Sequence, residues 1–110
     1  MTSRLIAAGA LWAAACTPEA MTIDQYPCPP QGTALTYESF GRPFLDAWCM
    51  RCHDDGPNGI YFRDQEEVAA RRARIFVNAA ATNTFMPPGP DDPAPEERDL
   101  LAEWLACGAP

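Results

Sequence analysis

Two proline-rich stretches divide the chain and limit where regular structure can form. The chain has twelve prolines, and eight of them lie within residues 27–30 and 87–95. Proline lacks the backbone N–H that a helix interior or a sheet ladder needs, so both stretches should be loops. No segment alternates apolar and polar side chains convincingly as a strand would. The sequence therefore predicts a small all-α domain with long proline-rich loops.

Two regions of helical spacing lie between these stretches. From Thr36 onward aromatic side chains recur every four residues, and Pro43 should cause either a kink or a turn followed by a helix starting near it. Asp64 and Glu67 match the capping-box pattern, in which a side chain satisfies an exposed backbone N–H at the helix start. They predict a second helix that runs to about Ala80.

The segment PEERDLLAEWLACG has the clearest helical pattern in the chain. Pro95 suits the first helical position, and the acidic residues after it complement the positive end of the helix dipole. Gly108 can adopt the left-handed conformation that often ends a helix. Apolar side chains at helical spacing predict the buried stripe, which consists of Leu101, Trp104 and Leu105 with Leu100 beside it.

The chain begins with one basic residue and a short apolar run. Arg4 precedes the 11 residues Leu5 to Ala15, which end in small alanines. This run is too short to span a bilayer, which takes about 20 residues. A basic start, an apolar middle and a small-residue end are typical of a secretory signal. Residues 1–15 are therefore predicted to be a signal peptide.

Cys16 directly follows three alanines, which resembles the lipobox of bacterial lipoproteins. In that family the cysteine is lipidated and becomes the mature N-terminus, although the family usually carries leucine at the position of Ala13. We expect Cys16 to anchor the protein to a membrane, and plain secretion is the alternative. Residues 16–34 are proline-rich and lack hydrophobic periodicity, so they are predicted to be a tether that becomes ordered near YPCPP.

The charge balance excludes one class of partner. The formal net charge is −7, and all eight basic residues are arginine. A nucleic-acid-binding protein needs a basic face, which such an acidic chain is not expected to offer. We therefore expect no nucleic-acid partner, and the acidic residues are interpreted as a solvated surface.

The chain's only histidine directly follows two cysteines that are three residues apart. The five residues Cys49 to His53, CMRCH, match the C-x-x-C-H pattern of covalent haem attachment. Within about one helical turn, two sulfurs can reach both vinyl groups while the next imidazole lies under the iron. A structural zinc site, a thioredoxin-like redox pair, and a simple disulfide or chance match are the alternatives.

Haem iron has a second axial position, and methionine is a common ligand there in electron-transfer proteins. Met1 leaves with the signal, Met50 lies inside the attachment motif, and Met21 falls in the tether. Met86, in the proline-stiffened loop NTFMPPGP, is therefore the predicted second ligand of the iron, opposite His53. The alternative is a core methionine that fills a gap.

These features together resemble the small monohaem cytochromes c of the class I type. The resemblance covers roughly Thr36 to Gly108: an aromatic helix leading into CxxCH, a middle helix, a methionine-proline loop and a C-terminal helix with an aromatic residue. It implies a helical domain, residues 35–110, wrapped around one covalent haem c.

The resemblance also implies specific contacts. Gly41 should pack against Trp104, although it could simply be a helix stop, and Pro43 departs from the usual first helix. A backbone carbonyl after the histidine should orient the imidazole, with candidates in Gly56 to Gly59. Further residues are candidates for the apolar walls (Ile60, Phe62, Phe76 and Phe85) and for pairing with a haem propionate (Arg71, Arg72 or Arg74).

Two cysteines remain once Cys16 is assigned to lipid and the CMRCH pair to haem. An oxidising envelope compartment permits a disulfide between these two, Cys28 and Cys107. Two unpaired thiols are the alternative.

The sequence therefore predicts an electron carrier rather than an enzyme. It would relay single electrons between redox protein partners in the bacterial cell envelope, on the periplasmic side. One alternative is a haem enzyme or ligand sensor whose sixth iron position is open. Another is a haem module that docks on a larger oxidoreductase and serves as its electron entry point.

Overall fold

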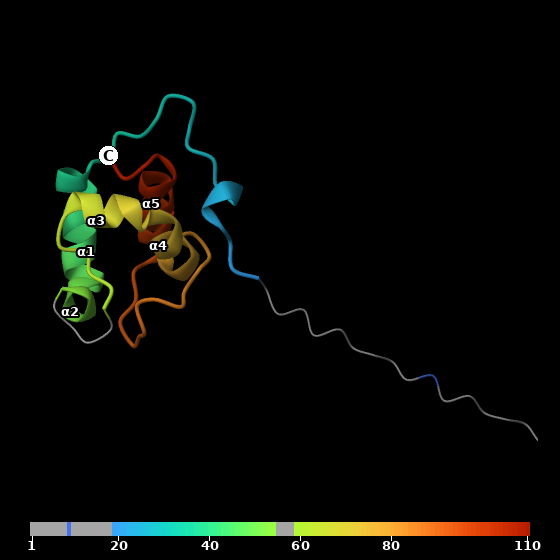
Figure 1. Cartoon of the computed structure of the whole chain (residues 1–110). Coiled ribbons are helices and arrows are strands. Elements are labelled where there is room, and N and C mark those ends of the chain that lie inside the picture. Colours follow the sequence, from blue (N-terminus) through green and yellow to red (C-terminus); the bar gives the residue numbers. More distant parts are fainter. Residues whose placement is uncertain (1–8, 10–18, 55–58) are drawn as a thin grey trace, which may run out of the picture.

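Short helices and long connections make up the domain. The structure, a computed structural model, describes residues 9, 19–54 and 59–110 (Figure 1). The predicted signal peptide, apart from residue 9, and the lipidation site Cys16 lie outside the described residues. Within the described ranges every regular element is helical, which confirms the all-α class. These elements are η1 (Ile23–Gln25), η2 (Tyr37–Gly41), α1 (Arg42–Trp48), α2 (Met50–His53), α3 (Gln65–Ala70), α4 (Arg72–Ala79) and α5 (Pro95–Ala106).

The first helical region changes geometry just before Pro43. The Thr36 hydroxyl accepts a hydrogen bond from the Ser39 N–H at 3.0 Å and so caps the π-helical turn η2. The Gly41 N–H reaches back five residues to the Thr36 carbonyl at 3.0 Å. The Arg42 N–H likewise reaches back five residues, to the Tyr37 carbonyl. The α-helix α1 then begins at Arg42, and Gly41 and Arg42 both have right-handed helical dihedral angles, so α1 follows the π-helical turn without a break. Of the two predicted outcomes, a turn followed by a helix that starts near Pro43 is the closer one, although the turn is itself helical.

The predicted helix from Asp64 to Ala80 is two helices. The Asp64 carboxylate accepts from the Glu67 N–H at 2.8 Å and caps α3, as expected. Glu67 itself accepts from the Arg63 N–H at 2.8 Å instead of completing a box with Asp64. At Arg71 the backbone leaves helical geometry (φ −105°, ψ 8°) and its N–H bonds to the Val68 carbonyl, three residues back. The prediction of one continuous helix was wrong at this residue, and α4 leaves in a different direction from α3 (Figure 1).

Helix α5 supplies the centre of the core. Leu101, Trp104 and Leu105 are fully buried, as their spacing predicted, whereas Leu100 is 41% exposed. Gly108 follows the helix with φ +98°, a left-handed conformation that glycine adopts at little cost. Against this stripe pack Phe44 and Leu45 of α1, Val68 of α3, and Ile75, Phe76 and Ala79 of α4.

Gly41 and Trp104 are in direct contact, as the family resemblance implied. A Cβ atom built on Gly41 would overlap the ring carbons Cζ2 and Cη2 of Trp104. The indole also lies 6.4 Å from the ring of Tyr37 and 6.1 Å from that of Phe40, measured between centroids. Its Nε1–H donates to the Pro110 carbonyl at 3.1 Å. The absence of a side chain at Gly41 therefore lets α5 approach the start of α1.

The N-terminal segment is ordered earlier than predicted. Met21 exchanges two hydrogen bonds with the Asn83 side chain: its N–H donates to Oδ1 at 2.8 Å, and its carbonyl accepts from Nδ2 at 2.7 Å. Met21, Ile23 and Tyr26 also pack against the core. The prediction of a tether that becomes ordered near YPCPP was therefore wrong for residues 21–25, because Met21 and Ile23 pack on a surface that sequence periodicity does not reveal.

A disulfide joins Cys28 to Cys107, as the sequence predicted. The two cysteines are 79 residues apart in the sequence, and their Cα atoms are 4.9 Å apart. In the chain-entropy model, closing a loop of that length stabilises the folded state by about 4 kcal/mol. Because a domain this small buries a limited core, this cross-link supplies a large share of its stability.

We predict that Gly41→Ala destabilises the domain by about 1–3 kcal/mol, the usual cost of overpacking. Gly41 has helical dihedral angles (φ −60°, ψ −54°) that alanine adopts readily, so the loss would come from the collision with Trp104. Denaturant unfolding measures it. In the control Gly89→Ala, the new Cβ would meet only Asp92 carboxylate oxygens at 3.9 Å, and stability should change by no more than about 0.5 kcal/mol. Equal losses in both variants would contradict the prediction.

Candidate cofactor site

One cavity brings together the side chains that the sequence singled out. It has a volume of about 450 Å³ and lies among α1, α2, α4 and the loop that follows α4. That volume falls within the range of about 300–1,000 Å³ that is typical of small-molecule and cofactor sites. Its lining is mainly apolar and includes all four candidates from CMRCH and the methionine-proline loop: Cys49, Cys52, His53 and Met86.

The CMRCH motif forms one helical turn at the end of α1. Cys49 has φ −118° and ψ −37°, and its carbonyl accepts from the N–H groups of Cys52 (3.2 Å) and His53 (3.0 Å). Cys52 is exposed, whereas Cys49 is half-buried. Burial raises the pKa of the Cys49 thiol to about 12, although the Arg98 charge offsets part of this effect. The Cys49 sulfur is therefore a protonated thiol at neutral pH.

The His53 ring is fixed in place by its neighbours. Its Nδ1 atom lies 2.8 Å from the Ile60 carbonyl oxygen. A carbonyl only accepts hydrogen bonds, so Nδ1 carries the proton and the lone pair of the neutral ring is on Nε2. The ring also packs on Phe62 at 4.7 Å between centroids, and the Phe62 N–H donates to the His53 carbonyl at 3.0 Å. This arrangement leaves Nε2 as the atom that can bind a metal.

The carbonyl that orients His53 lies just outside the predicted range. The candidates predicted from the sequence were Gly56 to Gly59, of which residues 56–58 lie outside the described residues. The acceptor is instead Ile60, the next residue along the chain. The side chain of Ile60 also lines the cavity, so this residue both holds the imidazole and forms part of the apolar wall.

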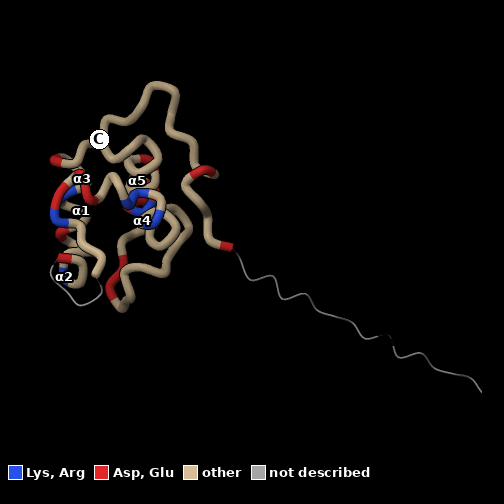
Figure 2. Tube along the Cα trace, in the orientation of Figure 1, with Lys and Arg blue, Asp and Glu red and all other residues tan. Residues whose placement is uncertain are grey.

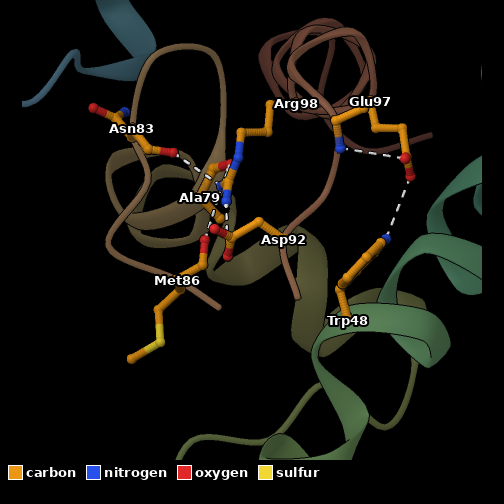
Figure 3. A network of polar contacts seen from close by, with 8 residues as sticks. Trp48, Ala79, Asn83, Met86, Asp92, Glu97 and Arg98 are labelled. Carbon is orange, nitrogen blue, oxygen red and sulfur yellow. Dashed lines mark hydrogen bonds and ion pairs between the residues drawn. The ribbon is translucent and has the colours of Figure 1, made fainter. Parts of the chain in front are cut away.

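Both backbone polar groups of Met86 are hydrogen-bonded. Its N–H donates to the Asn78 carbonyl on α4 at 2.8 Å. Its carbonyl accepts from Arg98 Nη1, on α5, at 2.8 Å. Figure 3 shows the thioether extending away from this polar contact. The loop thus presents the Met86 side chain to the cavity from a backbone that is attached to two helices.

Most of the other predicted lining residues lie where the sequence suggested. Ile60, Phe62 and Phe85 line the cavity, and Phe85 is 73% exposed. The prediction for Phe76 was wrong, because this ring is fully buried and packs on Tyr26, 5.8 Å away between centroids. Ile75 and Ala79, four residues apart on one face of α4, line the cavity in its place.

The three arginine candidates take different positions. Arg71 and Arg74 line the cavity. Arg72 instead donates from Nη1 to the Leu105 carbonyl at the end of α5, at 3.2 Å. Figure 2 shows these basic positions together around the start of α4, in a chain whose other visible charges are mainly acidic.

Sequence reasoning missed two residues at the start of α5. Arg98 is only 3% exposed and donates to backbone carbonyls beside the cavity (Figure 3). Its spacing to Leu101 and Leu105 places it on the buried stripe of α5, a signal that could have revealed it. Glu97 accepts from the Nε1–H of Trp48, a cavity residue, at 3.3 Å. No sequence pattern connects Glu97 with Trp48.

Within residues 9, 19–54 and 59–110, no group of three or more His, Cys, Asp or Glu side chains could hold a metal ion.

Comparison of this chain with protein-family models, curated proteins and solved structures found no match. The resemblance to cytochromes c therefore stays a prediction that depends on the residues and the geometry described above.

Proposed function

We propose that this chain is a small c-type cytochrome that relays single electrons. The observation that carries the proposal is the one cavity lined by Cys49, Cys52, His53 and Met86. Two of these residues are the pair of thiols for covalent attachment, and the other two supply the nitrogen and sulfur ligands typical of an electron-transfer haem. The two segments that carry them are separated in the sequence by α3 and α4. The Gly41–Trp104 contact is a second, independent point of agreement with the family.

The residues present are compatible with a haem. Its macrocycle is apolar, and so is most of the cavity lining; its propionates are anionic, and Arg71 and Arg74 lie at the cavity. Cys49 and Cys52 would hold the group covalently, and His53 and Met86 would be its iron ligands. When bound, the haem supplies an iron that accepts and donates one electron at a time.

The protein's own residues then have three tasks. The Ile60 carbonyl keeps the His53 ring oriented and its Nε2 available, which also makes the imidazole a stronger donor. As an iron ligand, the Met86 thioether would favour the ferrous state and so raise the reduction potential. Ile75, Phe62 and Trp48 line the cavity with apolar surface and would help to keep water from the bound group. Because both ligands would stay in place, little rearrangement would accompany each transfer.

We further propose that the protein acts in the bacterial cell envelope, on the periplasmic side. The support is the sequence before Cys16, which has the outline of an export signal and a lipobox. None of the helices in the described part of the chain is long and apolar enough to span a bilayer. A lipid on Cys16 would attach the protein to the membrane. The redox partners would bind the folded domain that follows this anchor in the sequence.

The first prediction of this proposal is covalent haem. Protein matured in an envelope that contains haem-attachment machinery should have the mass of the processed chain plus one haem, measured by mass spectrometry. Cys49→Ser/Cys52→Ser should remove that added mass. The matched control Cys28→Ser/Cys107→Ser removes two other cysteines and should keep the haem in whatever protein folds. A wild-type chain without added mass would refute the assignment.

The second prediction concerns Met86. Met86→Ala should abolish the weak red absorption band that a thioether sulfur gives on ferric haem, as the family resemblance implies. It should also lower the reduction potential and open the iron to small ligands. Visible spectroscopy, potentiometry and cyanide binding measure these effects. Met21→Ala is the control, because Met21 is also partly buried but packs on the core away from the cavity, and it should keep the band.

The same measurements separate the electron carrier from the other candidates. Wild-type protein that lacks the band and binds carbon monoxide or cyanide rapidly would have an open sixth position. The enzyme or sensor function would then replace the proposed one. If both methionine variants kept the wild-type spectrum, Met86 would not be the ligand.

The third prediction concerns the anchor. Cys16→Ser should move the protein from the membrane fraction to the soluble fraction of the envelope, because the thiol that carries the lipid is absent. Cell fractionation followed by immunodetection measures this. Thr17→Ser is a suitable control, since it changes the neighbouring residue but keeps the Cys16 thiol, and it should stay in the membrane fraction. Unchanged membrane retention of Cys16→Ser would count against lipidation.

A further inference from the structure

Arg98 occupies an unfavourable position for a cation. It lies in the first turns of α5, where the helix dipole is positive and favours acidic side chains such as the preceding Glu96 and Glu97. Its side chain is also almost completely buried, at 3% exposure for the residue. Burying a charge is costly unless hydrogen bonds compensate it. The position of Arg98 must therefore be explained by its partners.

Three backbone carbonyls converge on one nitrogen of this side chain. Nη1 lies 2.8 Å from the Ala79 oxygen, 3.0 Å from the Asn83 oxygen and 2.8 Å from the Met86 oxygen. Nη1 carries only two hydrogens, so at least one is shared between two acceptors. The Ala79 carbonyl belongs to the last turn of α4, where the dipole is negative and carbonyls lack helical partners. Figure 3 shows the three carbonyls grouped around the guanidinium.

The ion pair of Arg98 is a weaker partner than these carbonyls. Nη2 is 3.8 Å from Asp92 Oδ1 and makes no hydrogen bond to any described residue, and the Asp92 side chain is 51% exposed. Pairs with one partner in solvent contribute little to stability. The buried charge is therefore compensated mainly by the carbonyl dipoles of the segment that runs from the end of α4 to Met86.

We propose that Arg98 is a positioning residue that holds Met86 at the cavity. Hydrogen bonds hold the Met86 backbone on both sides. Its N–H donates to the Asn78 carbonyl on α4, and its carbonyl accepts from the Arg98 side chain on α5. The Arg98 main-chain carbonyl also accepts from the Ala81 N–H at 3.0 Å, which attaches the start of the same loop. Without the guanidinium, three carbonyls would lose a charged donor, and the loop would open more often. This inference rests on the proposed role of Met86 as an iron ligand.

Arg98→Met tests the proposal, because it keeps much of the side-chain volume and removes every donor. Cyanide should bind to the ferric variant about tenfold faster or more, since hydrogen bonds to a charged group of this kind are among the stronger ones. The red absorption band should weaken in parallel. Arg98→Lys keeps the charge without the planar fork, and its cyanide rate should lie between those of wild type and Arg98→Met.

The matched control is Arg72→Met. Arg72 also donates to a backbone carbonyl of the core, but its acceptor is Leu105 at the end of α5 rather than a residue of the Met86 loop. The Arg72→Met variant should have a lower overall stability, while its rate of cyanide binding should stay at the wild-type value. Wild-type cyanide rates in Arg98→Met, or an equal rise in Arg72→Met, would overturn the proposal. If Arg98→Met does not fold, Arg98→Lys decides alone: a rise of about threefold or more supports the proposal, and a smaller change overturns it.

Amide hydrogen exchange at Met86 gives a readout that does not depend on the iron. The Met86 N–H bonds to the Asn78 carbonyl, so loop opening should expose it, and its exchange should be faster in Arg98→Met but not in Arg72→Met. Failure of the proposed function would appear in the wild type, as missing haem or a missing band. Failure of the present inference would appear as unchanged Met86 exchange in Arg98→Met, whatever the wild-type spectrum shows.

Discussion

The contact between Trp104 and Gly41 sets the distance between α5 and the start of α1. A glycine in the last position of η2 leaves room for a fully buried indole, which the rings of Tyr37 and Phe40 also contact. Because α1 continues directly from η2 and ends at the CMRCH motif, the same contact places that motif relative to α5. The cavity between the motif and the Met86 loop depends on this spacing.

The start of α5 also connects the two walls of the cavity. Glu97 accepts from Trp48, at the end of α1 on the His53 side, and the next residue, Arg98, donates to the Met86 carbonyl on the other side. Successive residues of a helix point in directions about 100° apart, which is why neighbours in the sequence can reach opposite walls. The Trp48–Glu97 bond is long, at 3.3 Å, whereas the Arg98–Met86 bond is 2.8 Å, and both are partly buried. The methionine side is therefore the more firmly held of the two.

Covalent and polar attachments compensate for a modest core. The disulfide ties Cys28 to the residue that follows α5, and the Asn83 side chain holds Met21 on the core surface. Both attach the N-terminal segment, which has little regular structure of its own. Asn83 also donates to the Phe76 carbonyl at 2.9 Å and presents its own carbonyl to Arg98. One buried polar network thus links this segment, α4 and the Met86 loop.

Local features were predictable from the sequence because they depend on neighbouring residues. The cap at Asp64, the left-handed Gly108 and the buried stripe of α5 follow from backbone preferences and the 3.6-residue helical period. CMRCH matches the pattern of haem attachment from its residues alone, because the two thiols and the imidazole of that pattern lie within one helical turn.

Tertiary structure alone decided which of several neighbouring residues makes a given contact. Ile60 rather than a neighbouring residue orients His53, and Phe76 faces the core while Ile75 faces the cavity. In both cases the observed residue is the immediate neighbour of a predicted one, along the helix or along the loop. Hydrophobic periodicity does not resolve a difference of one residue. The role of Arg98 depends on three carbonyls that the chain brings together only when α4, the loop and α5 pack, because backbone groups carry no sequence signature.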